Sequence, residues 1–192
     1  MKIIPTNIPD LLIIEPTVFK DERGFFLESY NKQKFNEQGL NYDFVQDNHS
    51  KSCAGVLRGL HYQNAPYAQT KLVRVTQGSV IDVAVDLRVG SPSYLKSFSI
   101  ELSESNKKQL LIPKGFAHGF VVLSETCEFL YKCDALYNKE ADGGIYFNDA
   151  SLDIDWGNID LDNLIISDKD KNLPLVKDAT FNFPFEKYTN SL

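Results

Sequence analysis

Residues 72–87 have the pattern of two short strands joined by a tight turn. A strand-like run at 72–75 leads through Gln77 and Gly78 into a β-branched run at 80–87, in which polar and apolar side chains partly alternate. β-Branched residues on both sides of a glycine turn predict an antiparallel hairpin. The strongest local pattern in this chain therefore predicts a sheet.

Similar short runs recur along the chain and are separated by turn residues. They lie at 24–30, 43–49, 56–63, 94–102, 109–112, 119–123 and 128–137. Such runs are typical of an antiparallel sandwich or barrel. The best helix candidate is short, at 31–38, where Asn31 can cap the first turn and Gly39 can end the last. We expect a mainly β fold, an antiparallel jelly roll with short peripheral helices, and a tail from Asp160 onward of turns and short helices packed against the barrel.

The composition fits one globular domain over residues 1–192. The hydrophobic fraction is 43%, and the chain contains no internal repeat, low-complexity segment or linker. No apolar run approaches the roughly 20 residues that cross a bilayer. The N-terminus, with its single lysine and early Pro5, is a poor secretory signal. We expect a cytoplasmic protein with no membrane association.

The charge and the cysteines exclude several classes of protein. The formal net charge of -6 disfavours binding to nucleic acid, which needs a basic face, but leaves room for an anionic small molecule where basic residues cluster. Cys53, Cys127 and Cys133 are odd in number and form no Cys-x-x-Cys pair, which argues against a disulfide framework and a zinc site. We expect three buried, reduced thiols.

Two of the three histidines stand among glycine and aromatic residues. His61 follows Arg58 by three residues in the run 55–63, and His118 lies in the run 113–120. Arginine anchors anions and histidine transfers protons near neutral pH, so this combination suggests a catalytic site for an anionic ligand. A lone histidine in a strand is more often structural, and the motifs alone leave both interpretations open. His49 has no motif around it, and we assign it no role.

The spacing of Arg58 and His61 makes a geometric demand. Side chains three positions apart in a regular strand point to opposite faces of the sheet. A bulge at Gly59 would add one residue and let both side chains point inward. We therefore predict a bulge at Gly59, and in a regular strand one of the two assignments is wrong.

The spacing P-x-G-x-x-H at 113–118 resembles the second half of the cupin pattern, where many cupins bind a metal. The first half usually supplies His-x-His and a glutamate, whereas this chain has His61 followed by Tyr62 and Gln63. Too few nitrogen ligands remain for a typical iron, nickel or manganese site. We predict a cupin-type jelly roll with no metal and no cofactor.

A longer series of motifs resembles the dTDP-4-dehydrorhamnose 3,5-epimerase family in sequence and order. The matching blocks lie at 21–28, 46–50, 55–63, 71–75, 82–88, 115–120, 130–133, 148–149, 154–156 and 167–170. The resemblance covers about residues 2–176, and chance does not produce so many blocks in one order. The resemblance implies a cofactor-independent enzyme that acts on a thymidine-diphosphate 4-keto-6-deoxyhexose in the synthesis of deoxysugar nucleotides for polysaccharides.

The resemblance also implies the catalytic groups. The C4 ketone acidifies the protons on C3 and C5, so one base, one acid and an enolate stabiliser suffice to convert dTDP-4-dehydro-6-deoxy-D-glucose into dTDP-4-dehydro-L-rhamnose. By resemblance His61 is the base, supported by Asp170 in a histidine–carboxylate pair. Tyr131 returns the proton from the opposite face, and Lys71 lies near the developing enolate oxygen.

The same blocks imply a substrate site shared across a homodimer. Arg23 and Glu28 resemble residues that one subunit contributes through exchange of N-terminal strands. The implied contacts from the other subunit are Gln46, Asn48, Arg58, Lys71, His118 and Lys169. Tyr137 resembles an aromatic that stacks near the thymine, and Asp142 stands where the family often has glutamate. The basic residues of these sets suit the diphosphate by charge.

Alternatives remain open for the function and for single residues. A C3-only epimerase would carry the same motifs, and a metal-dependent cupin oxygenase or a non-catalytic sugar-nucleotide binding module are different classes. Tyr131 and Tyr137 are also compatible with core aromatics, and Arg23 with an ion pair to an acidic neighbour on a solvated turn. Asp82 and Asp86 are compatible with structural carboxylates at the barrel rim.

Overall fold

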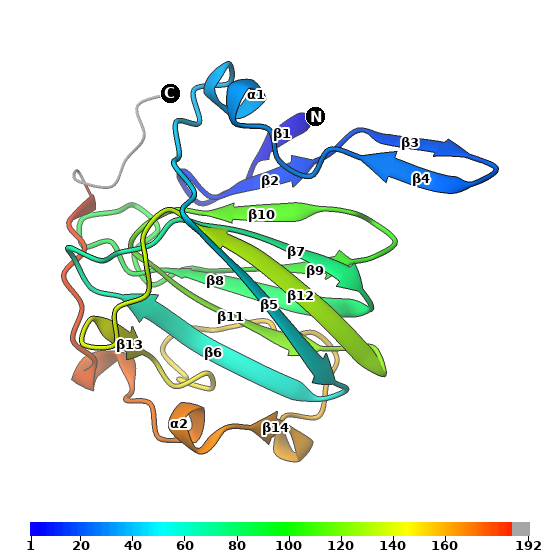
Figure 1. Cartoon of the computed structure of the whole chain (residues 1–192). Coiled ribbons are helices and arrows are strands. Elements are labelled where there is room, and N and C mark those ends of the chain that lie inside the picture. The colour runs from blue at the N-terminus through cyan, green and yellow to red at the C-terminus, as the bar shows by residue number, and fades with distance from the viewer. Residues whose placement is uncertain (186–192) are drawn as a thin grey trace.

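The structure is a computed structural model that describes residues 1–185, and it consists mainly of antiparallel strands in two large sheets (Figure 1). The first sheet has the order β1 (Lys2–Pro5), β2 (Leu12–Glu15), β10 (Gln109–Ile112), β7 (Lys71–Gln77), β12 (Thr126–Cys133) and β5 (Gln46–Cys53). The second has the order β13 (Asp142–Gly144), β6 (Val56–Gln63), β11 (Phe116–Val122), β8 (Ser79–Asp86) and β9 (Ser97–Ser103). The predicted mainly β, jelly-roll-like fold is confirmed.

The remaining elements are short. The hairpin of β3 (Val18–Asp21) and β4 (Gly24–Leu27) belongs to neither large sheet and projects away from the rest of the chain (Figure 1). The helices are α1 (Lys32–Asn36) and α2 (Asp168–Lys171), and 3-10 turns lie at Leu161–Asn163 and Val176–Asp178. The strand β14 (Ile165–Ile166) pairs with β6 in parallel, an exception to the expected antiparallel pairing. From Asp160 to Phe185 the predicted tail of turns and short helices is otherwise confirmed, and the rest of that tail lies outside the described residues.

The hairpin predicted at 72–87 is wrong in its pairing. Both strands form, as β7 and β8, but they belong to different sheets, so the turn at Gly78 is a corner between sheets. Gly78 has a φ of +78°, and a Cβ at this position would lie 2.1 Å from the carbonyl oxygen of Thr126. Only glycine permits so tight a corner. Local sequence predicted the strands and the turn but not the partner of each strand.

The predicted helix forms within the expected range. The Asn31 side chain accepts a hydrogen bond from the amide of Lys34 at 3.1 Å, and Gly39 follows the helix with a φ of +79°. Strand boundaries moved by several residues: β5 begins at Gln46 and β12 ends at Cys133. The short strands β1, β2, β3, β13 and β14 were not predicted.

The core between the two sheets is apolar and contains stacked aromatic rings. Phe120 on β11 and Phe129 on β12 stack at a centroid distance of 4.2 Å. The outer face of the second sheet is also covered, by a cluster that includes Trp156 and Phe183. Strands buried on both faces read as nearly continuous apolar runs, which explains the sequences of β8 and β11.

Two further expectations concern the cysteines and the membrane. Cys127 and Cys133 are buried as predicted, but Cys53 is exposed, because it ends β5 at an exposed turn. No helix within residues 1–185 is long and apolar enough to span a bilayer. The single domain over 1–192 stays a prediction, and residues 186–192 lie outside the described part of the chain.

Candidate functional site

A cavity of about 670 Å³ lies between the two sheets and receives side chains from both of them. It is also lined by residues 165–167, 169 and 170, which pass beneath β6 at the bottom of Figure 1. The predicted site residues that line it are Asn48, Arg58, His61, Lys71, His118, Tyr131, Lys169 and Asp170. Positions more than 100 residues apart in the sequence are therefore brought together.

His61 and Asp170 form a hydrogen-bonded pair in this cavity. The distance between His61 Nε2 and Asp170 Oδ1 is 2.8 Å, and the second carboxylate oxygen accepts from the amide of Gly59 at 3.2 Å. Ser167 caps the short helix that carries Asp170. Burial raises the pKa of Asp170, but the hydrogen bonds and charge of His61 outweigh it, so the pKa lies below its usual value. The ionised carboxylate therefore receives a proton from Nε2, and a neutral His61 keeps its lone pair on Nδ1.

The predicted bulge at Gly59 is present. On β6 and β11, His61 is opposite His118 and Arg58 is opposite Phe120, so three steps on one strand match two on the other. Gly59 has a φ of +121°, and a Cβ there would lie 2.6 Å from the Cα of Gly119. Because of this extra residue, Arg58 and His61 both line the cavity. Their spacing of three positions, which in a regular strand would place them on opposite faces, is therefore compatible with one shared cavity.

Tyr131 and Lys71 enter the cavity from the sheet opposite His61. They lie on neighbouring strands, and Lys71 Nζ is 5.9 Å from the centroid of the Tyr131 ring. Burial raises the pKa of the Tyr131 phenol, so the ring keeps its proton at neutral pH. Burial lowers the pKa of Lys71, against the opposing effect of Cys133 and nearby carboxylates. Among residues 1–185, no carboxylate forms an ion pair with this ammonium group.

His118 is paired with Asp82, which corrects one expectation from the sequence. Its Nε2 lies 2.9 Å from Asp82 Oδ2, and Asp82 is fully buried inside the barrel and not at its rim. The alternation of β8 explains this position, since Val80 and Ala84 on the same face belong to the core between the sheets. Asp86 is also fully buried, where it pairs with Arg88. The interpretation as a rim carboxylate is therefore wrong for Asp82, whereas Asp86, the last residue of β8, is a structural carboxylate.

A group of polar residues lies beside the cavity and is joined by hydrogen bonds. Asp142 Oδ2 accepts from Lys169 Nζ at 2.5 Å and from the Tyr137 hydroxyl at 3.3 Å. Gln46 accepts from the amide of Tyr137 at 2.9 Å and donates to Asn48 at 3.1 Å. Tyr137 is 56% exposed, so the core interpretation of this residue is wrong. These contacts connect Gln46, Tyr137 and Asp142 to the cavity lining through their partners.

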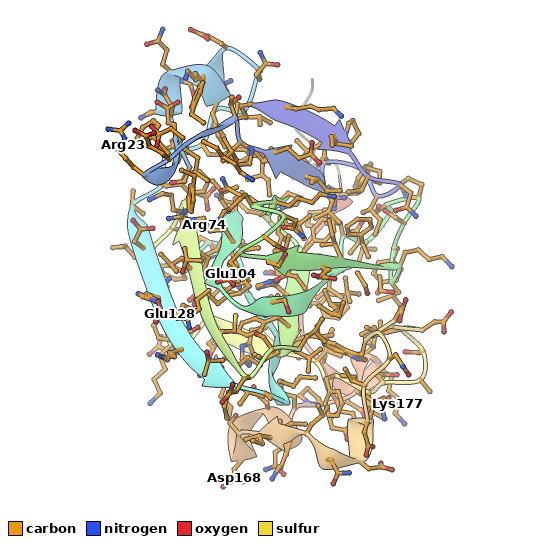
Figure 2. The ribbon with its side chains drawn as sticks, turned by 90° about the vertical axis from the view of Figure 1, so that its right-hand side faces the viewer. Arg23, Arg74, Glu104, Glu128, Asp168 and Lys177 are labelled. Atoms are coloured by element: carbon orange, nitrogen blue, oxygen red, sulfur yellow. The ribbon has the colours of Figure 1, made fainter. Side chains whose placement is uncertain are left out.

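Arg23 and Glu28 do not line this cavity. Arg23 extends from the tip of the β3–β4 hairpin, 85% exposed, and pairs with Asp21. Figure 2 shows it at one end of the molecule, with Asp168 of the helix α2 at the other. Glu28 follows β4 and pairs with Lys34. The structure of one chain therefore leaves these two predicted residues outside the site.

His49 borders the cavity, but its side chain is 55% exposed and its Nε2 lies 3.3 Å from Glu128 Oε2. Successive side chains of a strand point to opposite faces, so the side chains of Asn48 and His49 on β5 cannot both enter the cavity. His49 therefore has no role in the site, as the sequence analysis assigned. No cluster of three or more His, Cys, Asp or Glu side chains suited to a metal occurs in residues 1–185, and the absence of a metal stays a prediction.

Comparison with known sequences places the chain in a family. The sequence profile of the dTDP-4-dehydrorhamnose 3,5-epimerase family matches residues 5–178. The chain belongs to this family. A dTDP-4-dehydrorhamnose 3,5-epimerase of Shigella flexneri is 54% identical over 182 residues, which cover 94% of this chain and 99% of the relative. One of Escherichia coli K12 is 54% identical over 175 residues, or 90% and 93% of the two chains.

Solved structures of the family agree with the fold. The dTDP-4-dehydrorhamnose 3,5-epimerase of Elizabethkingia anophelis NUHP1 is 57% identical, with a TM-score of 0.88 over 93% of this chain and 97% of the other. The dTDP-6-deoxy-D-glucose-3,5-epimerase of Legionella pneumophila Philadelphia 1, solved in complex with dTDP-4-keto-L-rhamnose, is 47% identical. Its TM-score is 0.86, over 92% of this chain and 93% of the other. The family's fold is therefore preserved over nearly the whole described chain.

Proposed function

We propose that the protein epimerises dTDP-4-dehydro-6-deoxy-D-glucose at C3 and C5 to give dTDP-4-dehydro-L-rhamnose. The observation that carries the proposal is that one cavity holds a histidine–carboxylate pair on one sheet and a protonated tyrosine on the other. Relatives with more than half of their residues identical to this chain are named as enzymes of this reaction.

The geometry suits proton transfer at two faces of one sugar. His61 takes a proton from the carbon next to the ketone, and the Asp170 carboxylate stabilises the imidazolium that forms. The enolate oxygen is stabilised by the ammonium of Lys71, which has no ion-pair partner among residues 1–185. Tyr131, which enters from the facing sheet, gives a proton to the opposite face of the carbon, and the configuration inverts.

Proton NMR of the 4-keto-6-deoxyglucose nucleotide in deuterated water tests the proposal. We expect deuterium at both C3 and C5 with inversion, and a turnover about 10²- to 10⁴-fold lower in His61→Ala with nearly unchanged affinity for dTDP. Tyr131→Phe is expected to block inversion while exchange without inversion can persist. Full activity of His61→Ala would contradict the proposal.

The same spectra separate the alternatives. Deuterium at C3 alone would identify a C3-only epimerase, a possibility that the fold does not decide, because a 3'-monoepimerase of Streptomyces bikiniensis has a TM-score of 0.82 at 28% identity. Binding without exchange would identify a sugar-nucleotide binding module. Metal analysis of the purified protein would reveal a metal-dependent cupin oxygenase.

The remaining predicted residues complete the proposed substrate site. Arg58 and Lys169 are the cations suited to the diphosphate on this chain, and Asn48, Gln46, His118, Tyr137 and Asp142 are the polar and aromatic contacts. Arg58 donates to Ser52 at 3.2 Å and is otherwise exposed, so its guanidinium can reach a ligand. Bidentate contacts from arginine to phosphate are among the stronger hydrogen bonds in proteins.

The proposed enzyme is a homodimer in which the partner supplies Arg23 and Glu28. The hairpin that carries Arg23 exposes Phe19, Phe25 and Phe26, an apolar surface that a second copy would cover. Mixing Arg23→Ala with His61→Ala under subunit exchange should produce some sites with both residues intact, and activity should rise above that of either variant. Verified heterodimers without activity would refute the shared site. Cytoplasmic location and supply of a polysaccharide pathway stay predictions.

A further inference from the structure

Two histidine–carboxylate pairs meet at the cavity. His118 on β11 is the direct cross-strand partner of His61 on β6, and both line the cavity. Facing residues of antiparallel strands have Cβ atoms about 4.5–5.5 Å apart. Each histidine has its own carboxylate, because Asp170 comes from α2 and Asp82 comes from β8 on the other side. The proposed mechanism uses the first pair and gives Asp82 no part.

The two imidazoles differ in their access to solvent. The His61 side chain is 30% exposed, whereas that of His118 is 8% exposed. The His118 ring also packs against Phe129, with 6.0 Å between the centroids and 29° between the planes. A base must release its proton to water in every turnover, which His61 can do. His118 is enclosed and fixed, which suits a hydrogen bond to a ligand better than proton exchange.

Stability alone does not explain a carboxylate at position 82. Asp82 is 0% exposed, and its Oδ1 has no hydrogen-bond partner among residues 1–185. A buried carboxylate oxygen that lacks partners destabilises a fold, and such groups in native proteins usually serve a function. Within the described part of the chain, the one hydrogen bond of the Asp82 side chain goes to His118. The role of Asp82 is therefore to be sought in what it does to that ring.

We propose, on the basis of the epimerase function above, that Asp82 is a positioning residue for the reaction. Its carboxylate holds the Nε2–H of His118 and so fixes both the tautomer and the plane of the ring. The nitrogen left for the substrate is Nδ1, whose lone pair then accepts a hydrogen bond from a hydroxyl group of the sugar. His118 thereby holds the sugar in position between His61 and Lys71, while His61 remains the base.

The isosteric variant Asp82→Asn tests the tautomer directly. An amide that donates to Nε2 favours the opposite tautomer, with the proton on Nδ1. We expect kcat to fall about 10²-fold, as when a hydrogen bond that positions the substrate is lost, while the dissociation constant of dTDP stays within about threefold of the unchanged protein. In a His118→Ala background the same substitution should cost nothing further, because Asp82 acts only through His118.

A spectroscopic measurement separates this inference from the proposed function. In ¹⁵N-histidine NMR of the unliganded protein, His118 should carry its proton on Nε2, and Asp82→Asn should move it to Nδ1. A neutral His118 with its proton on Nδ1 in the unchanged protein overturns the inference even if Asp82→Asn fails to fold. Full activity of a folded Asp82→Asn, or a full additional loss in the His118→Ala background, also overturns it. The NMR result does not depend on the substrate, so it stands even if epimerisation is not observed.

Discussion

Two fully buried carboxylates on the same strand have opposite surroundings. Asp86 Oδ1 accepts from the amide and Nε of Arg88, both at 2.9 Å, and Oδ2 accepts from Arg88, Ser91 and Ser93. Asp82, four residues earlier, has one side-chain hydrogen bond and one oxygen without a partner among residues 1–185. A saturated carboxylate beside a buried arginine is what a stable fold requires. A carboxylate that lacks hydrogen bonds, next to a cavity histidine, is tolerated where it serves a reaction.

The contrast between Asp86 and Asp82 would be refuted most directly if Asp86 could be removed without loss of stability. Asp86→Ala leaves the Arg88 guanidinium buried with Asp10 as its remaining carboxylate partner, at 2.7 Å. Breaking a buried ion pair from one side costs about 3–5 kcal/mol. We expect urea denaturation to show a loss of that size, or the variant to be recovered unfolded. A loss below about 1 kcal/mol would show that this cluster does not stabilise the fold.

Asp170→Asn should produce the second largest effect, on turnover and not on stability. The amide keeps the size of the carboxylate and can still accept from Gly59, but it does not stabilise the imidazolium of His61. We expect kcat to fall by at least about 10²-fold with the melting temperature nearly unchanged. Equal losses of activity and stability would place Asp170 with Asp86 as a structural carboxylate.

The stability at acid pH tests the role of Asp86 further, and the expected change in unfolding free energy is smaller. Burial raises the pKa of Asp86, but hydrogen bonds from Arg88, Ser91 and Ser93 outweigh it and hold the pKa below 3.8. A lowered pKa stabilises the fold fully above the unfolded value, and this contribution is lost as the pH falls through the folded value. The difference in unfolding free energy between the unchanged protein and Asp86→Asn should be constant from neutral pH to about pH 4 and narrow below it. If the difference in unfolding free energy between the two proteins is already lost above pH 5, the lowered pKa of Asp86 is contradicted.

Asp142→Asn should produce the smallest effect. The Lys169 side chain is 55% exposed, so its ion pair with Asp142 contributes no more than about 1 kcal/mol. Removing this charge frees Lys169 for the diphosphate but weakens the proposed contact of Asp142 with the substrate, and because the two effects oppose each other we expect isothermal titration with dTDP to show a change in affinity of at most about fivefold. A larger loss of affinity would indicate that the Asp142 carboxylate is a main contact of the nucleotide.

The sequence predicted strands better than strand partners. Alternation and turn residues identified β7, β8 and the glycine between them, because these signals are local. Which strands pair depends on contacts between distant segments, so the corner at Gly78 looked like a hairpin. The bulge at Gly59 could be predicted, because Arg58 and His61 were both expected in the cavity, although a regular strand would point them to opposite faces.

The site was predicted unevenly for a similar reason. The resemblance to the family supplied Asp170, which no motif near His61 reveals. The partner of His118 was missed, since a lone Asp82 in a β-branched run does not show how deeply it is buried or which ring it faces. The hairpin residue Arg23 cannot be connected to the cavity within one chain.

The extra residue at Gly59 also matters to anyone who transplants this chemistry. Copying Arg58 and His61 onto a regular strand of another barrel would aim one of them at the cavity and the other at its wall. The graft must include the glycine, its facing Gly119 and the single offset between the strands. What must be transferred is thus the backbone geometry of this stretch, because it sets the directions in which the reactive side chains point.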